Sequence, residues 1–174
     1  MHSLSTHSAG SDTVNRAIVA YDSGDARALI DKVNAHNAEL YGHPDQTPVS
    51  TEEFDPEHGG LFVVAYVDGQ PVACGGYRRH LEDPSGATVE IKRMYVEETH
   101  RRSGLARRVL RWLEDAAFAA GYREAILDCG SKQSPAHALY ESCGYVRIES
   151  FSIYKDKPGN RAYGKPLAST AGSA

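Results

Sequence analysis

The sequence has 174 residues, of which 41% are hydrophobic and 24% are charged, so we expect one domain with a buried core. A formal net charge of −4 gives no general nucleic-acid footprint, and no apolar run is long enough to predict a membrane-spanning helix. Three cysteines without CxxC spacing argue against a disulfide framework or a zinc site. We therefore expect a cytoplasmic protein without a metal, a nucleic-acid partner or a membrane partner.

The first half of the chain predicts strands around one helix. Residues 13–21 favour a strand, and Ser23 or Asp25 is a candidate N-cap for a helix that runs to about Leu40. Residues 42–60 are polar, contain three prolines and predict a loop. Asp68-Gly69 predicts a hairpin turn between strands 61–67 and 70–78, and a further strand follows at about 87–96.

The second half predicts two more helices. Apolar residues recur at helical spacing from Gly104 to about Ala120, and a short strand follows at 124–129. Ser134 is a candidate N-cap before Pro135, in a helix that stops at Gly144. Segments 145–154 and 162–166 are candidate closing strands. The fold class is therefore α/β or α+β, with a sheet packed by helices.

Charge is unevenly distributed along the sequence. Residues 92–111 contain seven of the 19 Lys and Arg residues and two acidic residues. Residues 43–58 contain five acidic residues and no Lys or Arg. The basic stretch favours binding of a polyanion and the acidic stretch favours a cation, although most such runs are only solvated surface.

The most informative segment is 101–106, Arg-Arg-Ser-Gly-Leu-Ala, which opens the long helix after a strand. A helix N-terminus has unpaired backbone N–H groups that phosphate satisfies, and Gly104 and Ala106 allow close approach. Charge-assisted donors are supplied by Arg101, Arg102 and Arg107. The alternative is an ordinary helix start with a solvated basic face. A nucleotide-triphosphate P-loop and a dinucleotide fingerprint are excluded, because their motifs are absent.

This Arg-x-x-Gly-x-Ala segment resembles the coenzyme A pyrophosphate loop of the GNAT superfamily of N-acetyltransferases. The blocks at 90–96 and 138–145 match as well, and the resemblance covers about residues 13–167. It implies a GNAT fold, with a central mixed, mostly antiparallel sheet of about six to seven strands flanked by helices. We expect one such domain at 13–167 between flexible tails at 1–12 and 168–174. Homodimerisation is an expectation that comes from the family alone.

The resemblance also implies a co-substrate, acetyl-CoA. In the strand at 87–96, Val89, Ile91 and Tyr95 share a face with Arg93, and a β-bulge would resolve this irregular alternation. By resemblance, the backbone after the bulge pairs with the pantetheine arm. The predicted cofactor-binding residues are Met94, Tyr95, Val96, Arg101, Arg102, Ser103, Gly104, Leu105, Ala106, Arg107 and Gln133.

Two residues are candidates for acid–base chemistry. Glu90 is the predicted general base, because an amine is mostly protonated at neutral pH and must lose a proton before it attacks a thioester. Alternatively, Glu90 pairs with Lys92 or another basic residue, or assists through water. Tyr140 is the predicted acid for the leaving thiolate, a role that the resemblance implies. Its alternative is a packed aromatic on an amphipathic helix.

The acceptor is expected to be an amine of a small molecule or a protein. The resemblance places it over the first helix, its following loop and the late strands. The candidates there are His36, Asn37, Tyr41, the acidic loop 43–58, Tyr77, Phe151 and Tyr154. The leading prediction is direct acetyl transfer to a primary amine. The alternatives are a different acyl-CoA or acceptor, and a CoA-binding sensor without turnover.

Overall fold

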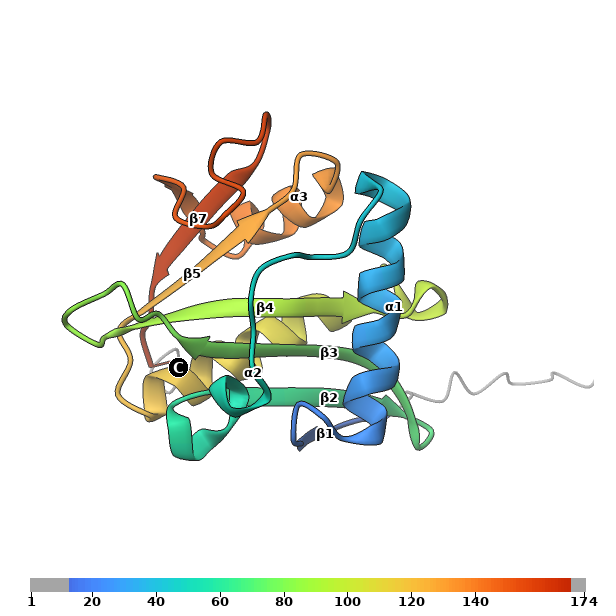
Figure 1. Ribbon diagram of the computed structural model, residues 1–174. Coiled ribbons are helices and arrows are strands. Elements are labelled where there is room, and N and C mark those ends of the chain that lie inside the picture. The colour runs from blue at the N-terminus through green and yellow to red at the C-terminus, as the bar shows by residue number, and fades with distance from the viewer. Residues whose placement is uncertain (1–12, 170–174) are drawn as a thin grey trace, which may run out of the picture.

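The computed structural model describes residues 13–169 (Figure 1). The strands are β1 Val14–Ile18, β2 Leu61–Val67, β3 Gln70–Arg79, β4 Thr88–Val96, β5 Glu124–Cys129, β6 Val146–Ile148 and β7 Arg161–Pro166. The helices are α1 Gly24–Tyr41, α2 Leu105–Ala119 and α3 Ser134–Ser142, with short 3-10 turns η1 Thr51–Phe54, η2 Pro56–His58 and η3 Glu98–His100. The predicted tails fall largely outside the described residues.

The seven strands form one sheet in the order β1-β2-β3-β4-β5-β7-β6. All neighbours are antiparallel except β4 and β5, which are parallel. Helix α1 crosses the front of the sheet in Figure 1, and α2 lies behind it. The predicted mixed, mostly antiparallel sheet flanked by helices is therefore confirmed.

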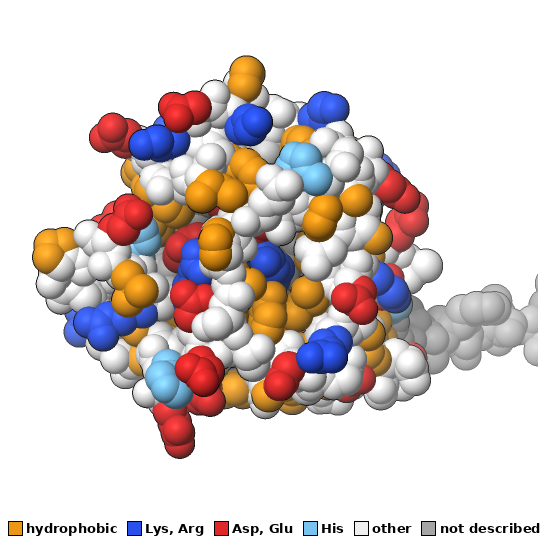
Figure 2. Space-filling view, in the orientation of Figure 1, with side chains coloured by type: hydrophobic (Ala, Val, Ile, Leu, Met, Phe, Trp, Pro, Cys, Tyr) orange, Lys and Arg blue, Asp and Glu red, His pale blue; other side chains and the backbone are white. Residues whose placement is uncertain are grey.

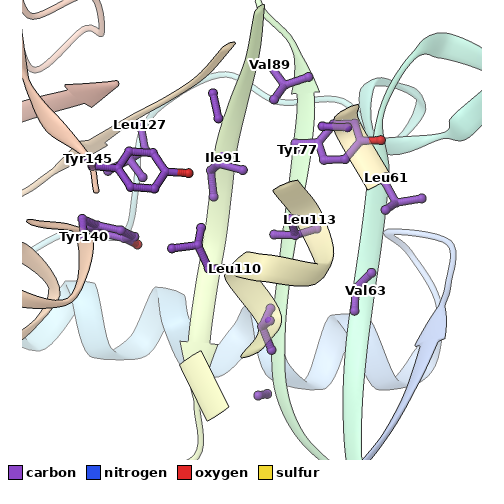
Figure 3. Close-up of a cluster of buried hydrophobic side chains, with 14 of the residues drawn as sticks. Leu61, Val63, Tyr77, Val89, Ile91, Leu110, Leu113, Leu127, Tyr140 and Tyr145 are labelled. Atoms are coloured by element: carbon purple, nitrogen blue, oxygen red, sulfur yellow. The ribbon is translucent and has the colours of Figure 1, made fainter. Parts of the chain in front are cut away.

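Helices α1 and α2 each cover a hydrophobic core on one face of the sheet. The α1-side core contains Leu29, Phe62 and Cys74. The larger α2-side core, drawn in Figure 3, joins strands β2 to β5 to α2 and reaches Tyr140 of α3. Burial of apolar surface on both faces of a sheet is what holds such a three-layer arrangement together.

Local turn chemistry fixed several boundaries as predicted. The side chain of Ser23 accepts a hydrogen bond from Ala26 N and caps α1. Asp68 and Gly69 both have positive φ, as a type I′ hairpin turn requires. Helix α3 differs by one residue, because Gln133 rather than Ser134 occupies its N-cap.

The predicted closing strand at 145–154 is wrong over most of its length. Only Val146–Ile148 pairs with β7, and residues 149–160 form a loop. The hydroxyl of Tyr154 lies 3.1 Å from Asp45 Oδ1, so this loop is anchored to residues far away in the sequence. That tertiary contact outweighs the local strand propensity of the segment.

The predicted bulge in β4 is confirmed. Gly75 of β3 stands opposite both Arg93 and Met94, and Arg93 has a φ of 62°. A Cβ at Gly75 would lie 2.5 Å from Met94 Sδ, so glycine is needed for the close approach. The bulge turns Lys92 and Arg93 to the α1 side of the sheet, whereas Ile91 and Met94 face the α2-side core.

Strands β4 and β5 pair over only three residues each and then separate. The ladder joins Thr88–Glu90 to Glu124–Ile126 and ends there. Beyond this point β5 is paired only with β7, and β4 only with β3. We refer to this opening between 91–96 and 127–129 as the fork. It interrupts the centre of the sheet and leaves one edge of β4 open.

Candidate active site

A cavity of about 340 Å³ passes through the fork. Its walls come from α1, residues 43–45, both strands of the fork, residues 130–133, Tyr140 and the loop 154–160. Figure 2 shows this face, where basic and acidic side chains lie close together in the central hollow. A volume of this size is typical of small-molecule sites.

The open edge of β4 presents backbone groups to the cavity side. Glu97 N donates to Val72 O, so alternation along the ladder directs the amides of Met94 and Val96 away from β3. Val96 O accepts a bond from Arg101 Nε at 3.0 Å. Tyr95, between these two residues, has its backbone groups directed toward β3, and its ring packs against the α1-side core. The outward groups of Met94 and the amide of Val96 are therefore available to an extended ligand that carries amides, whereas the carbonyl of Val96 is already bonded by Arg101.

The start of α2 carries unpaired backbone donors. Gly104 is the N-cap with a φ of 78°, and the first helical bond runs from Arg108 N to Gly104 O. Among the described residues, the amides of 105–107 therefore have no protein partner. A Cβ at Gly104 would meet nothing within 4 Å, so space lies in front of these donors. The arrangement fits a phosphate group.

The polar side chains of residues 101–107, around the start of α2, each contact a different part of the structure. Arg101 lies over the ring of Tyr95, and Ser103 Oγ donates to His100 O at 2.6 Å. Arg107 reaches α3, where it donates to Ser142 Oγ at 2.8 Å. Arg102 is exposed and has a φ of 64°. The basic side chains thus surround the helix start, but Arg107 points toward α3.

Tyr140 lies at the α2 side of the fork. Its side chain is buried, lines the cavity and packs edge-on against Tyr145, with ring centroids 5.8 Å apart (Figure 3). No hydrogen bond to its hydroxyl is found among residues 13–169. Burial, with added effects from Cys129 and Asp128, raises the pKa of Tyr140. The hydroxyl therefore stays protonated and can donate a hydrogen bond or a proton.

Glu90 lies in a cluster of ion pairs. Arg78 Nε is 3.2 Å from its Oε2, and Lys92 Nζ is 3.9 Å from its Oε1. His80 Nδ1 is also 3.9 Å away. Glu90 is buried and is not among the residues that line the cavity. These contacts favour the ion-pair alternative, and the base role stays a prediction.

Gln133 does line the cavity. Its Nε2 donates to Asn37 Oδ1 at 3.1 Å, and its Oε1 accepts from Cys129 Sγ at 3.4 Å. These bonds fix the side chain between α1 and β5. Gln133 therefore connects the expected acceptor region of α1 with the fork.

The acidic loop 43–58 is less available to a cation than its composition indicates. Asp45 turns inward, lies 3.1 Å from Lys92 Nζ and also pairs with Arg93. Burial opposes ionisation of Asp45, but the charges of Lys92 and Arg93 and hydrogen bonds from Thr47 outweigh it and lower its pKa. Glu53 pairs with Arg78 at 3.2 Å. The bulge at Arg93 brings these charges together, a contact that linear spacing does not show.

The acceptor candidates divide into two groups. Asn37, Tyr41, Asp45 and Tyr154 line the cavity, as expected. Tyr77 instead packs in the α2-side core, Phe151 packs against His80, and His36 is not among the cavity-lining residues. Residues that the sequence reasoning missed also line the cavity, and they include Asp128, Lys157 and Asn160. Asp128 had one signal, because it is the only charged residue between Ala125 and Cys129.

Within residues 13–169, no group of three His, Cys, Asp or Glu side chains is placed to hold a metal ion. None of the described helices has the length and apolar character needed to cross a bilayer.

Sequence comparison shows clear relatives. Residues 30–145 match the acetyltransferase (GNAT) family. An IAA acetyltransferase of Azospirillum brasilense is 36% identical over 106 residues, which are 61% of this chain and 67% of that protein. The chain spans less of other curated relatives, for example 43% of N-acetyltransferase 8 of Homo sapiens.

Structural comparison gives the same fold. A Klebsiella pneumoniae protein, provisionally described as an acyl-CoA N-acyltransferase, has a TM-score of 0.74 at 24% identity, over 90% of this chain and 99% of that one. YncA from Salmonella typhimurium, solved with its cofactor acetyl-CoA, has a TM-score of 0.63 at 18% identity, over 91% and 96% of the two chains.

Proposed function

This chain belongs to the acetyltransferase (GNAT) family, and we propose that it transfers an acetyl group from acetyl-CoA to a primary amine. The observation that carries the proposal is the pairing of two backbone features. Unpartnered amides at the start of α2 fit a diphosphate, and the open edge of β4 fits the amides of a pantetheine arm. Both features border the fork that holds the cavity.

The cofactor residues divide by how they would act. Main-chain groups of Gly104, Leu105, Ala106 and Arg107 would hold the diphosphate, with Arg101 and Arg102 adding positive charge. Main-chain groups of Met94 and Val96 would hold the pantetheine arm. When bound, acetyl-CoA supplies an activated acyl group as a thioester. Three residues would hold the site in shape and would not bind the cofactor through free main-chain groups. The ring of Tyr95 packs in the α1-side core, Ser103 Oγ bonds to His100 O, and Gln133 bonds to Asn37.

Tyr140 is proposed as the group that protonates the leaving thiolate. Three observations support this role. The hydroxyl belongs to a cavity-lining residue, it has no partner among the described residues, and its raised pKa keeps it protonated at neutral pH, so a hydrogen-bond donor faces the leaving sulfur. Cys129 is a poor alternative as an acyl carrier, because burial raises the pKa of its thiol to about 12.

We propose that the acceptor is an amine of a small molecule or of a protein. We also propose that residues 13–167 form the catalytic domain and that the protein acts in the cytoplasm. The test is a panel of primary amines mixed with the chain and acetyl-CoA, with release of free thiol as the measurement. We expect thiol release that depends on both an amine and acetyl-CoA. Calorimetry should show acetyl-CoA binding in parallel. Binding without thiol release for any amine would instead indicate a CoA-binding sensor.

A further inference from the structure

Asp128 occupies a particular position in the fork. On β5, Ala125, Leu127 and Cys129 face the α2-side core, so strand alternation directs Asp128 to the α1 side. Asp128 lies two residues beyond Ile126, where the ladder with β4 ends. Its half-buried side chain lines the cavity. Asp128 is thus on the side where the acceptor is expected.

The carboxylate of Asp128 is uncommitted. No hydrogen bond or ion pair of this side chain is found within residues 13–169. Continued pairing of β4 and β5 would bring Lys92 beside Asp128, but the strands diverge and Lys92 bonds Asp45 at 3.1 Å instead. The other acids near the fork, Asp45 and Glu90, are already held by Arg78, Lys92 and Arg93.

Asp128 and Tyr140 flank the fork from its two sides. Tyr140 belongs to the α2-side core, whereas Asp128 faces α1 and the loop at 43–45. Burial is the main cause of the raised pKa of both Tyr140 and Tyr154, and the negative charge of Asp128 adds a smaller effect at each, so the carboxylate lies within electrostatic range of both hydroxyls. A reacting carbon in the fork would therefore have a proton donor on one side and a free carboxylate on the other.

We propose that Asp128 binds the ammonium group of the acceptor and takes up its proton. This inference rests on the proposed acetyl transfer and replaces Glu90 as the base. One proton passes from the ammonium to Asp128, and the freed nitrogen lone pair forms the new C–N bond. The C–S bond breaks, and its electron pair leaves on sulfur, which takes the Tyr140 proton. The second proton lost by nitrogen restores Tyr140, and Asp128 releases its proton to water.

Other titratable groups lie near Asp128, and their protonation can also change the activity with pH. Cys129, Tyr140 and Tyr154 interact with its charge. The other charged or titratable residues that line the same cavity are Tyr41, His43, Asp45, Lys92, Arg93 and Lys157. Because several of these groups titrate, the test compares variants with each other and does not rely on one pH profile alone.

The test uses Asp128→Asn, with Asp128→Glu as the conservative variant. Glu124→Gln is the matched control, because Glu124 lies on the same strand, is exposed and is not among the cavity-lining residues. We expect Asp128→Asn to lower kcat/KM for an alkylamine at neutral pH by about 100-fold or more. The loss should shrink as the pH approaches the pKa of the amine. A weakly basic aromatic amine, already unprotonated, should lose much less.

Further measurements distinguish a failure of the Asp128 proposal from a failure of the proposed acetyl transfer. Acetyl-CoA binding should be unchanged in all three variants, and Asp128→Glu should recover part of the activity. If Asp128→Asn matches Glu124→Gln with the alkylamine, Asp128 is not the base. An equal loss for both amines, with no change in the pH profile, would overturn the proposal too. If the unaltered chain binds acetyl-CoA but acetylates no amine, the proposed function itself fails.

Discussion

A substitution at Gly104 tests the diphosphate site most directly. Its Cβ would meet nothing within 4 Å, so a glutamate side chain fits without a clash inside the protein. The added carboxylate would lie at the start of α2, where it can accept bonds from the free amides and repel a phosphate. We expect Gly104→Glu to fold and to lose most of its affinity for acetyl-CoA.

The magnitude follows from ligand linkage. Acetyl-CoA at about 100 times its Kd should stabilise the unaltered chain by about 2.7 kcal/mol. For a domain of this size that corresponds to a rise in Tm of roughly 5–11 °C. The φ of 78° at Gly104 costs a non-glycine residue about 1–2 kcal/mol, so the variant without ligand should melt roughly 2–8 °C lower.

Gly121→Glu provides the matched control at the other end of the same helix. Gly121 also has a positive φ, 101°, and also has no atom within 4 Å of a Cβ. Both variants therefore carry the same charge and a similar backbone cost. Thermal unfolding with and without acetyl-CoA should show the ligand-induced rise in Gly121→Glu and not in Gly104→Glu. An undiminished rise in Gly104→Glu would show that the diphosphate binds elsewhere.

Two further predictions concern Tyr140 and Asp45. Tyr140→Phe should lower turnover by about 100-fold while calorimetry shows unchanged acetyl-CoA binding; the free energy of unfolding should change by less than about 1 kcal/mol, because no partner of the hydroxyl is found in residues 13–169. Full activity would remove Tyr140 from the acid role. Asp45→Asn should destabilise the fold by about 3 kcal/mol in denaturant unfolding, because it leaves Lys92 and Arg93 without their shared carboxylate. The pKa of Asp45 is lowered in the fold, so its contribution is present above its ordinary pKa of about 4 and is lost as the pH falls below that value. The variant should therefore approach the unaltered chain in stability at acid pH, and a constant difference from pH 7 to pH 3 would contradict the ion-pair assignment.

The sequence predicted those parts of the fold that local chemistry decides. The hairpin at Asp68-Gly69 needs two residues that tolerate positive φ, and the sequence shows both. The loop at 149–160 was missed, because its path depends on the contact between Tyr154 and Asp45. The helix start at Gly104 was predictable for the same local reason as the hairpin. For Asp128 the one signal, a charge within an apolar strand, does not reveal its place in the cavity, because that depends on where β4 and β5 separate.

The distribution of charge around the fork explains why the two acidic candidates differ. Six charged side chains form an ion-pair network in which each neighbour has the opposite charge, in the order Glu53, Arg78, Glu90, Lys92, Asp45 and Arg93. Charges inside a protein persist when they are paired in this way, and the positive and negative charges of this network cancel. A proton taken up by Glu90 would leave Arg78 and Lys92 under-compensated in a buried setting. Asp128 lies outside this ion-pair network and is partly exposed, so it can exchange a proton without disturbing the buried pairs. The fold therefore separates the carboxylates that hold β4 in place from the one that is free to react.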